Sequence, residues 1–255
     1  MPRITFLGTG TSQGVPPIGC TSPVCLSQDP KDKRLRCSIL VDYGDTKIVV
    51  DTGPDFRQQM LSVRATQLDA VLFTHEHKDH TAGLDDIRPF NFMQDKPMDI
   101  YATPWVQDAL KKQFDYIFAD LKYPGLPKVN LLNASKDEVI EINGHRIVPI
   151  EVMHHKLPVL GFRFDDFTYI TDANYISPEE KEKIKGTKVL VLNALRKEAH
   201  ISHFTLQEAI DLARELEVDQ TYLTHISFQL GFHAEEDAKL PSGINLAYDG
   251  LEIEV

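Results

Sequence analysis

The chain lacks the features of a secreted or membrane-spanning protein. It has only three cysteines, Cys20, Cys25 and Cys37, an odd number without the dense spacing of a disulfide framework. No apolar run approaches the length needed to cross a bilayer, and the run at residues 4–7 is too short for a signal peptide. We therefore expect a cytoplasmic protein with no membrane contact.

Positive charge is also scarce. Lysine and arginine total 27 against 38 acidic residues, which gives a net charge of −11. This balance argues against a protein that grips phosphate backbones, so nucleic acid is not an expected partner. A small phosphorylated substrate is still allowed, because bound metal ions supply local positive charge.

Apolar segments and helix signals predict a layered α/β (α+β) fold. With 42% hydrophobic residues the chain can bury a large core in one domain or two small ones, and we expect one domain over residues 1–255. Short apolar segments predict strands at 4–7, 37–43, 47–51, 70–73, 139–142, 146–152, 161–164, 168–171, 188–192 and 220–224. Helices are expected at 55–64 and 104–116, and after the capping residues Ser177 and Thr205.

A dense group of metal-ligand residues follows one predicted buried strand. Residues 74–80 read THEHKDH, directly after the apolar run at 70–73. Imidazole and carboxylate groups are the ligands that divalent cations such as zinc prefer. His75 and His77 can grip one ion, while Asp79 and His80 can reach a second ion about 3.5–4 Å away. Four groups cannot fill two coordination spheres, so further ligands must come from elsewhere.

Three more candidate positions lie at the ends of predicted strands. His154 and His155 follow one strand, Asp172 ends another, and His225 follows a third. Spacing alone does not choose between His154 and His155. We expect two other histidines, His145 and His233, to be exposed.

The motif HEHKDH at 75–80 resembles the signature of the metallo-β-lactamase-like hydrolase superfamily. The resemblance covers essentially the whole chain and is closest to the PhnP-like phosphoribosyl cyclic phosphodiesterase branch. It is carried by LGTGTSQGVP at 7–16, IVVDTG at 48–53, HHKLP at 154–158, LTHIS at 223–227 and LPSG at 240–243. It implies a four-layer αββα sandwich with mixed sheets packed face to face and helices outside. It also implies that Asp51 braces the metal loop.

The resemblance assigns a role to each candidate ligand. It implies two divalent metal ions per chain, with either Zn2+ or Mn2+ compatible with the ligand set. His75, His77 and His154 would hold one ion, Asp79, His80 and His225 the other, and Asp172 would bridge them. The family pattern favours His154 over His155.

The resemblance also implies a catalytic histidine. In the family such a histidine contacts the scissile phosphate just before a helix. Here it corresponds to His203, two residues before the cap Thr205, with His200 as a nearby competitor.

One part of the family pattern is missing from this chain. Some members hold a structural zinc with closely spaced N-terminal cysteines and a histidine beyond the last ligand. Here Ser22 stands between Cys20 and Cys25, and Phe228 follows His225 by three positions. Two cysteines cannot satisfy four-coordinate zinc, so we expect this site to be degraded or absent.

These features predict a binuclear hydrolase that cleaves a small phosphodiester, cyclic or open-chain. In this interpretation a metal-bound hydroxide attacks phosphorus, Asp79 and Asp172 orient it, and His203 stabilises charge or protonates the leaving oxygen. The nearest basic candidates to meet the phosphate are Arg88 and Lys156.

Other functions remain as alternatives. They are a tRNA 3′-processing endoribonuclease, a glyoxalase II-like thioesterase, and a non-hydrolytic protein that keeps metal for structure or redox sensing. A homodimer is compatible with the sequence.

Overall fold

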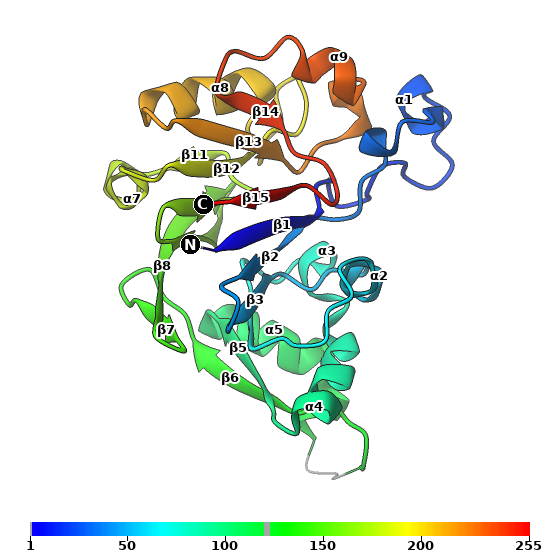
Figure 1. Ribbon diagram of the computed structural model, residues 1–255, viewed down its shortest axis with the longest axis vertical. Helices are drawn as coiled ribbons and strands as arrows, with labels where there is room; N and C mark the ends of the chain where they lie inside the picture. The colour runs from blue at the N-terminus through cyan, green and yellow to red at the C-terminus, as the bar shows by residue number, and fades with distance from the viewer. Residues whose placement is uncertain (1, 120–122) are drawn as a thin grey trace.

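The strands form two mixed sheets. The computed structural model describes residues 2–119 and 123–255, and Figure 1 shows the arrangement of its elements. The first sheet has the order β15-β1-β2-β3-β4-β5-β6 and the second β11-β8-β9-β10-β12-β13-β14, with β7 paired to β8. Strands β3 to β6 run parallel to one another, as do β10, β12, β13 and β14.

The strand bounds are as follows. The first sheet contains β1 (Arg3–Gly8), β2 (Ser38–Asp42), β3 (Lys47–Val50), β4 (Ala70–Leu72), β5 (Met98–Ala102), β6 (Val129–Asn133) and β15 (Glu252–Glu254). The second contains β7 (Ile140–Ile142), β8 (His145–His154), β9 (Leu157–Phe164), β10 (Phe167–Tyr169), β11 (Tyr175–Ile176), β12 (Val189–Asn193), β13 (Gln220–Thr224) and β14 (Ile244–Leu246).

Helices cover the outer face of each sheet. On the first sheet lie α2 (Phe56–Ser62), α4 (Arg88–Gln94) and α5 (Pro104–Gln113), and on the second lie α7 (Pro178–Ile184) and α8 (Leu206–Glu215). The shorter helices are α1 (Pro23–Leu26), α3 (Lys78–Thr81), α6 (Asp115–Phe118), α9 (His233–Asp237) and the 3-10 turns η1 (Pro30–Asp32), η2 (Leu84–Ile87) and η3 (Phe228–Leu230).

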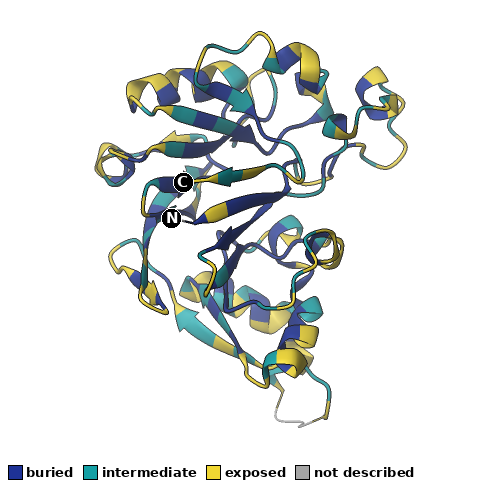
Figure 2. Cartoon of the chain, viewed as in Figure 1, coloured by how far each residue is buried: buried dark blue, intermediate teal, exposed yellow. Residues whose placement is uncertain are grey.

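Both faces of each sheet are buried, which explains the continuous apolar runs. Ile48 and Val50 point into the core between the sheets, whereas Val49 packs under the helices of the first sheet. In β12, Val191 belongs to the central core and Leu190 to the core under α7 and α8. Figure 2 shows that the strands are mostly buried and that the outer faces of the helices are exposed. The four-layer αββα prediction is therefore confirmed.

The ten predicted strands are all present, with differences at their ends. β9 begins at Leu157, earlier than the expected residue 161, although Pro158 lies inside it. The helix expected at 104–116 is interrupted at Phe114, whose φ of −124° is not helical. The sequence prediction missed five strands, β5, β6, β11, β14 and β15. β6 has no fully buried residue, so its sequence carries no apolar run.

Two further observations concern the expected location. Cys20 and Cys25 form a disulfide, while Cys37 is free and buried. This disulfide joins residues only five positions apart. The sequence analysis did not predict it. Over residues 2–119 and 123–255, no helix combines the length and the apolar character that a membrane crossing requires. The cytoplasmic location stays a prediction.

Candidate metal centre

The histidine-rich loop leaves β4 and enters α3, so a core strand sets its position. Asp51, just after the neighbouring strand β3, holds the loop at three atoms. Thr74 donates from its amide to Asp51 Oδ1 (2.9 Å) and from its hydroxyl to Asp51 Oδ2 (2.8 Å), and His80 Nδ1 lies 2.6 Å from Asp51 Oδ2. Asp51 is fully buried with a φ of 64°, which is uncommon outside glycine. These contacts match the bracing role that the resemblance implies.

A first group of three histidines lies at the start of this loop and the end of β8. His75 Nε2 is 3.0 Å from His77 Nδ1, and ligand atoms of His75, His77 and His154 lie within 4.8 Å of one another. The Nδ1 atoms of His75 and His154 contact Thr74 Oγ1 (2.9 Å) and the Ser202 carbonyl (2.9 Å). These contacts leave Nε2 of both rings available for a metal ion.

His155 lies outside this group. It is exposed, has a φ of 58°, and its amide donates to Asn174 Oδ1 (2.8 Å). His154, by contrast, is buried at the end of β8. The structure therefore places His154 rather than His155 beside His75 and His77.

A second group forms around Asp172. Asp79, Asp172 and His225 each offer a ligand atom within 4.8 Å of the others. His80 Nε2 lies 3.1 Å from Asp79 Oδ2 and 3.2 Å from Asp172 Oδ2, and His225 Nδ1 lies 3.0 Å from Asp172 Oδ2. Asp172 also forms a group with His75 and His80. Asp172 therefore lies between the two groups of ligand residues, which is the position that a bridging ligand requires.

The donor atoms fit divalent cations. His80 Nε2 is buried and forms no hydrogen bond within the described part of the chain, although two carboxylates lie within 3.2 Å of it. A cation shared by such a nitrogen and these carboxylates would satisfy all of them at once. Nitrogen and oxygen donors of this kind suit zinc and manganese.

The charges of the centre also favour cations. Burial by itself raises the pKa of Asp172, but His225 and His80 outweigh it and hold that pKa well below its ordinary value. Burial opposes the charged form of His80, yet Asp172, Asp51 and Asp79 raise its pKa well above the ordinary value. Burial likewise acts against charge on His225, and chiefly Asp172 raises its pKa to about 10. The carboxylates therefore stay ionised, and protons on the histidines compete with metal ions.

His203 lies beside both ligand groups. Its Nδ1 is 3.9 Å from Asp172 Oδ1, and its ring centre is 4.6 Å from that of His154 and 4.7 Å from that of His225. Burial, with help from His225, lowers the pKa of His203 to about 2. His200 stacks on its outer side at 4.9 Å and is more exposed. Burial lowers the pKa of His200 as well, so both rings are neutral and His203 is the inner member of the pair.

An open cavity of about 480 Å³ adjoins the first ligand group. It is lined by His77, His154, His155, Lys156, Leu157, Ile201 and Ser202. Lys156 is thus placed where a phosphate could meet it. Arg88, the other basic candidate, pairs with Asp85 (3.0 Å) and does not line this cavity.

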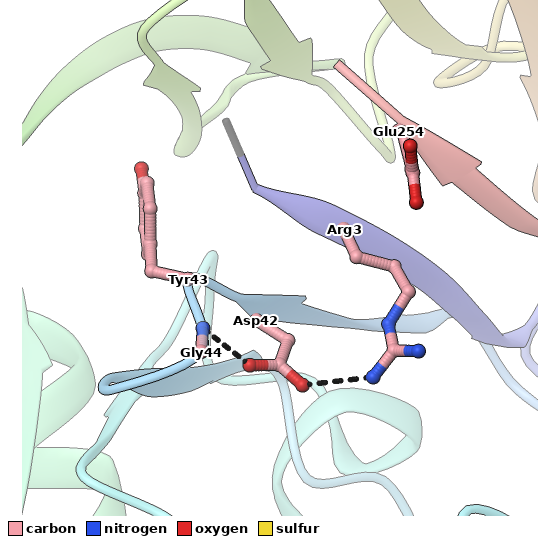
Figure 3. Close-up of a pocket in the computed structure, with 5 residues that line it drawn as sticks. All are labelled: Arg3, Asp42, Tyr43, Gly44 and Glu254. Atoms are coloured by element: carbon pink, nitrogen blue, oxygen red, sulfur yellow. Dashed lines mark hydrogen bonds and ion pairs between the residues drawn. The ribbon is translucent and has the colours of Figure 1, made fainter.

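Another cavity, drawn in Figure 3, lies where β1 begins, at the end opposite to the metal loop. Its polar groups contact one another: Asp42 Oδ2 accepts from Arg3 Nη2 (3.1 Å), and Asp42 Oδ1 accepts from the Gly44 amide (2.8 Å). None of the candidate site residues lines it. We assign it no role.

Two expectations about single histidines differ from the structure. His233 was expected to be exposed but is buried, with its Nδ1 3.0 Å from the Arg34 guanidinium, which is buried as well. His145 is partly covered by stacking on Tyr43, with ring centres 3.7 Å apart. The sequence prediction also gave no role to Thr11, whose hydroxyl lies 3.3 Å from His225 Nε2.

Two face-to-face mixed sheets with clustered histidines and aspartates at the strand ends define the class of metal-dependent hydrolases. The family model described as "Beta-lactamase superfamily domain" matches residues 46–226, and the chain therefore belongs to the metallo-β-lactamase superfamily. All seven expected ligands lie inside that match. The chain is a metallo-β-lactamase-fold hydrolase, and this fold implies bound divalent metal ions.

Individual relatives add detail. A crystal structure described as a new diphosphatase from the PhnP family is 39% identical, with a TM-score of 0.93, over 100% of this chain and 98% of that one. A protein named octanoyltransferase from Porphyromonas gingivalis (strain ATCC BAA-308 / W83) is 39% identical over 98% of this chain, which spans 51% of that protein's length. A ribonuclease Z from Methanopyrus kandleri is 26% identical over 89% of this chain and 94% of its own length.

Proposed function

We propose that this chain is a binuclear metal-dependent hydrolase of a small phosphodiester, cyclic or open-chain. The observation that carries the proposal is that all seven expected ligands, together with His203, fall into four overlapping groups, three of which include the buried Asp172. Four-coordinate structural sites need fewer ligands than this. We also propose that residues 1–255 form one domain, because both sheets contribute ligands to the same centre.

In this proposal His75, His77 and His154 hold one ion, Asp79, His80 and His225 hold the other, and Asp172 bridges them. When bound, two divalent ions lower the pKa of a water molecule and neutralise charge that develops on the phosphate. The imidazole and carboxylate donors support zinc or manganese.

The chain's own residues would position the substrate and the attacking water. Asp79 and Asp172 both have lowered pKa values, because nearby histidines outweigh the effect of burial. Their ionised carboxylates can accept a hydrogen bond from the attacking water. His203 is neutral in this environment, which favours donation of an N–H hydrogen bond to a phosphate oxygen over proton transfer to the leaving group. Lys156 would meet the phosphate at the rim of the cavity.

A second candidate substrate is a diphosphate ester. The 39% identical structure is described as a diphosphatase, and the same centre could act on a P–O–P bond. The net charge of −11 speaks against an RNA-processing role. The name octanoyltransferase is not carried over, because the chain spans only about half of that protein.

The test is metal analysis combined with a substrate panel. Purified protein reconstituted with zinc or manganese should bind two ions per chain. It should hydrolyse bis(p-nitrophenyl) phosphate, and should act faster on a small cyclic phosphodiester or a diphosphate ester. His77→Ala should lose one ion and the activity together. One ion per chain, or hydrolysis of lactoylglutathione without any phosphodiester turnover, would contradict the proposal.

A further inference from the structure

A further cavity of about 550 Å³, mostly apolar and called the second cavity below, lies beside the metal loop. Glu76, which stands between the ligands His75 and His77, forms part of its wall. Leu157 lines both this cavity and the one that contains His77 and His154. The two cavities therefore adjoin at Leu157, next to the metal loop.

The floor of this second cavity comes from β9 and its mouth from the start of α5. Leu160 and Val159 are buried on β9, and the Leu160 amide donates to the Thr74 carbonyl (3.0 Å), which ties the floor to the metal loop. Trp105 lies in the first turn of α5 and is 69% exposed. A large apolar side chain at the mouth of a cavity is a frequent feature of a binding site.

The orientation of Trp105 points to a flat ligand. Its indole Nε1 donates to Glu76 Oε1 (2.8 Å), which holds the edge of the ring while the side chain stays exposed. Nucleic-acid bases stack on the flat face of an aromatic ring of this kind. The hydrogen bond also links the ring directly to the metal loop.

The charged side chains that line the second cavity indicate which chemical groups it can bind. The charged residues that line the cavity are Glu76 and Glu151, with no lysine or arginine among its described lining. One oxygen of each is engaged, by Trp105 Nε1 and by Lys136 Nζ (3.2 Å), which leaves the second oxygens for a ligand donor. Carboxylates repel a phosphate and accept hydrogen bonds from amino groups. The phosphate end of a substrate therefore belongs at the metal ions and Lys156, and an amino-bearing ring belongs here.

We infer that this cavity binds the amino-bearing nucleobase of a nucleoside phosphate, with Trp105 stacking on the base and Glu76 accepting a hydrogen bond from its amino group. This inference rests on the proposed function, which supplies the phosphate end of the substrate. It names the substrate class that the phosphodiesterase proposal leaves open.

The experiment uses the fact that Trp105 is the chain's only tryptophan. Metal-loaded protein is titrated with AMP, purine riboside 5′-phosphate, ribose 5-phosphate and n-octyl phosphate. All four carry the same phosphate, so differences in affinity report on the second cavity. AMP should change the tryptophan fluorescence and bind about 5- to 100-fold more tightly than ribose 5-phosphate, the usual range for one stacked base. Purine riboside 5′-phosphate, which lacks the amino group, should bind several-fold more weakly than AMP.

Variants check the assignment by calorimetry. Trp105→Ala should reduce the affinity for AMP to near that of ribose 5-phosphate, and Trp105→Phe should keep part of the difference. Phe92→Ala removes another exposed aromatic ring, one that does not line this cavity, and should leave AMP affinity unchanged. Equal affinities for AMP and ribose 5-phosphate, or tight binding of n-octyl phosphate, would overturn the inference. Equal binding of AMP and purine riboside 5′-phosphate would remove the role of Glu76.

Failure of this inference is distinct from failure of the proposed function. Binding of AMP is measured at equilibrium and requires no turnover. Hydrolysis of bis(p-nitrophenyl) phosphate without a preference for AMP over ribose 5-phosphate would keep the hydrolase and reject the base site. AMP binding without any phosphodiester turnover would keep the base site and reject the hydrolase.

Discussion

Replacing Asp51 with asparagine should weaken one metal ion without disturbing the fold. Asp51 Oδ2 lies 2.6 Å from His80 Nδ1, so the carboxylate keeps the proton on Nδ1 and leaves Nε2 free to bind metal. The amide of asparagine can instead donate to Nδ1, which would move the proton to Nε2 and block it. Asparagine has the same size and tolerates the φ of 64° at this position.

The expected size of the effect follows from this geometry. Residues that orient a metal-binding histidine typically change metal affinity by about 10- to 100-fold, or about 1.4–2.7 kcal/mol. The loss should fall on the ion held by Asp79, His80 and His225. The ion held by His75, His77 and His154 should be retained, because Asp51 reaches His75 through the Thr74 hydroxyl rather than by direct contact.

The assay is competition between the protein and a chelator, read as metal ions bound per chain. Asp51→Asn should bind one ion at chelator concentrations where the wild type binds two. Asp95→Asn is the matched control, since Asp95 is exposed and also has a positive φ of 49°. Equal affinity for both ions in Asp51→Asn and the wild type would refute the reasoning about His80.

Three further predictions concern other positions. His203→Ala should keep both ions but lower kcat by about 10²–10⁴-fold, the scale for a positioned catalytic group; loss of metal on analysis would instead make His203 a ligand. Burial raises the pKa of Asp249 to about 6, so its protonated form is favoured in the folded state. The stabilisation of the folded state by protonated Asp249 is fully present below about pH 4 and is lost as pH rises through 6. The difference in Tm between wild type and Asp249→Asn should therefore change between pH 5 and pH 7.5, and a pH-independent difference would contradict this. Thr205→Ala removes the capping box with Glu208 and should cost about 1 kcal/mol, which thermal unfolding would show as a Tm lower by about 2–4 °C; an unchanged Tm would mean that the cap is dispensable.

The sequence was sufficient wherever the relevant information is local. The strand at 70–73 and the ligand-rich loop at 74–80 are adjacent in the chain, so pattern and chemistry appear together. The caps Ser177 and Thr205 also act within one helical turn, and both hold their helices as predicted. Continuous apolar runs predicted buried strands. This prediction holds because helices cover the outer face of both sheets.

Other features depend on contacts between distant segments. His154 and His155 are neighbours in sequence, but the end of β8 buries His154 while the side chain of His155 is exposed. His233 looked like a surface residue because its partner Arg34 lies at the other end of the chain. A side chain's burial is decided by what packs against it, and sequence spacing carries no record of that.

The sequence by itself determined the superfamily-type fold, the metal loop and the chemical nature of the ligands. Only the tertiary structure decided which strand ends converge on Asp172, and how Trp105 meets Glu76 at a cavity next to the metal loop. The physical reason is that strand pairing and sheet packing bring the carboxyl ends of separate strands to one edge. A metal centre and its substrate cavity exist only after these long-range contacts have formed.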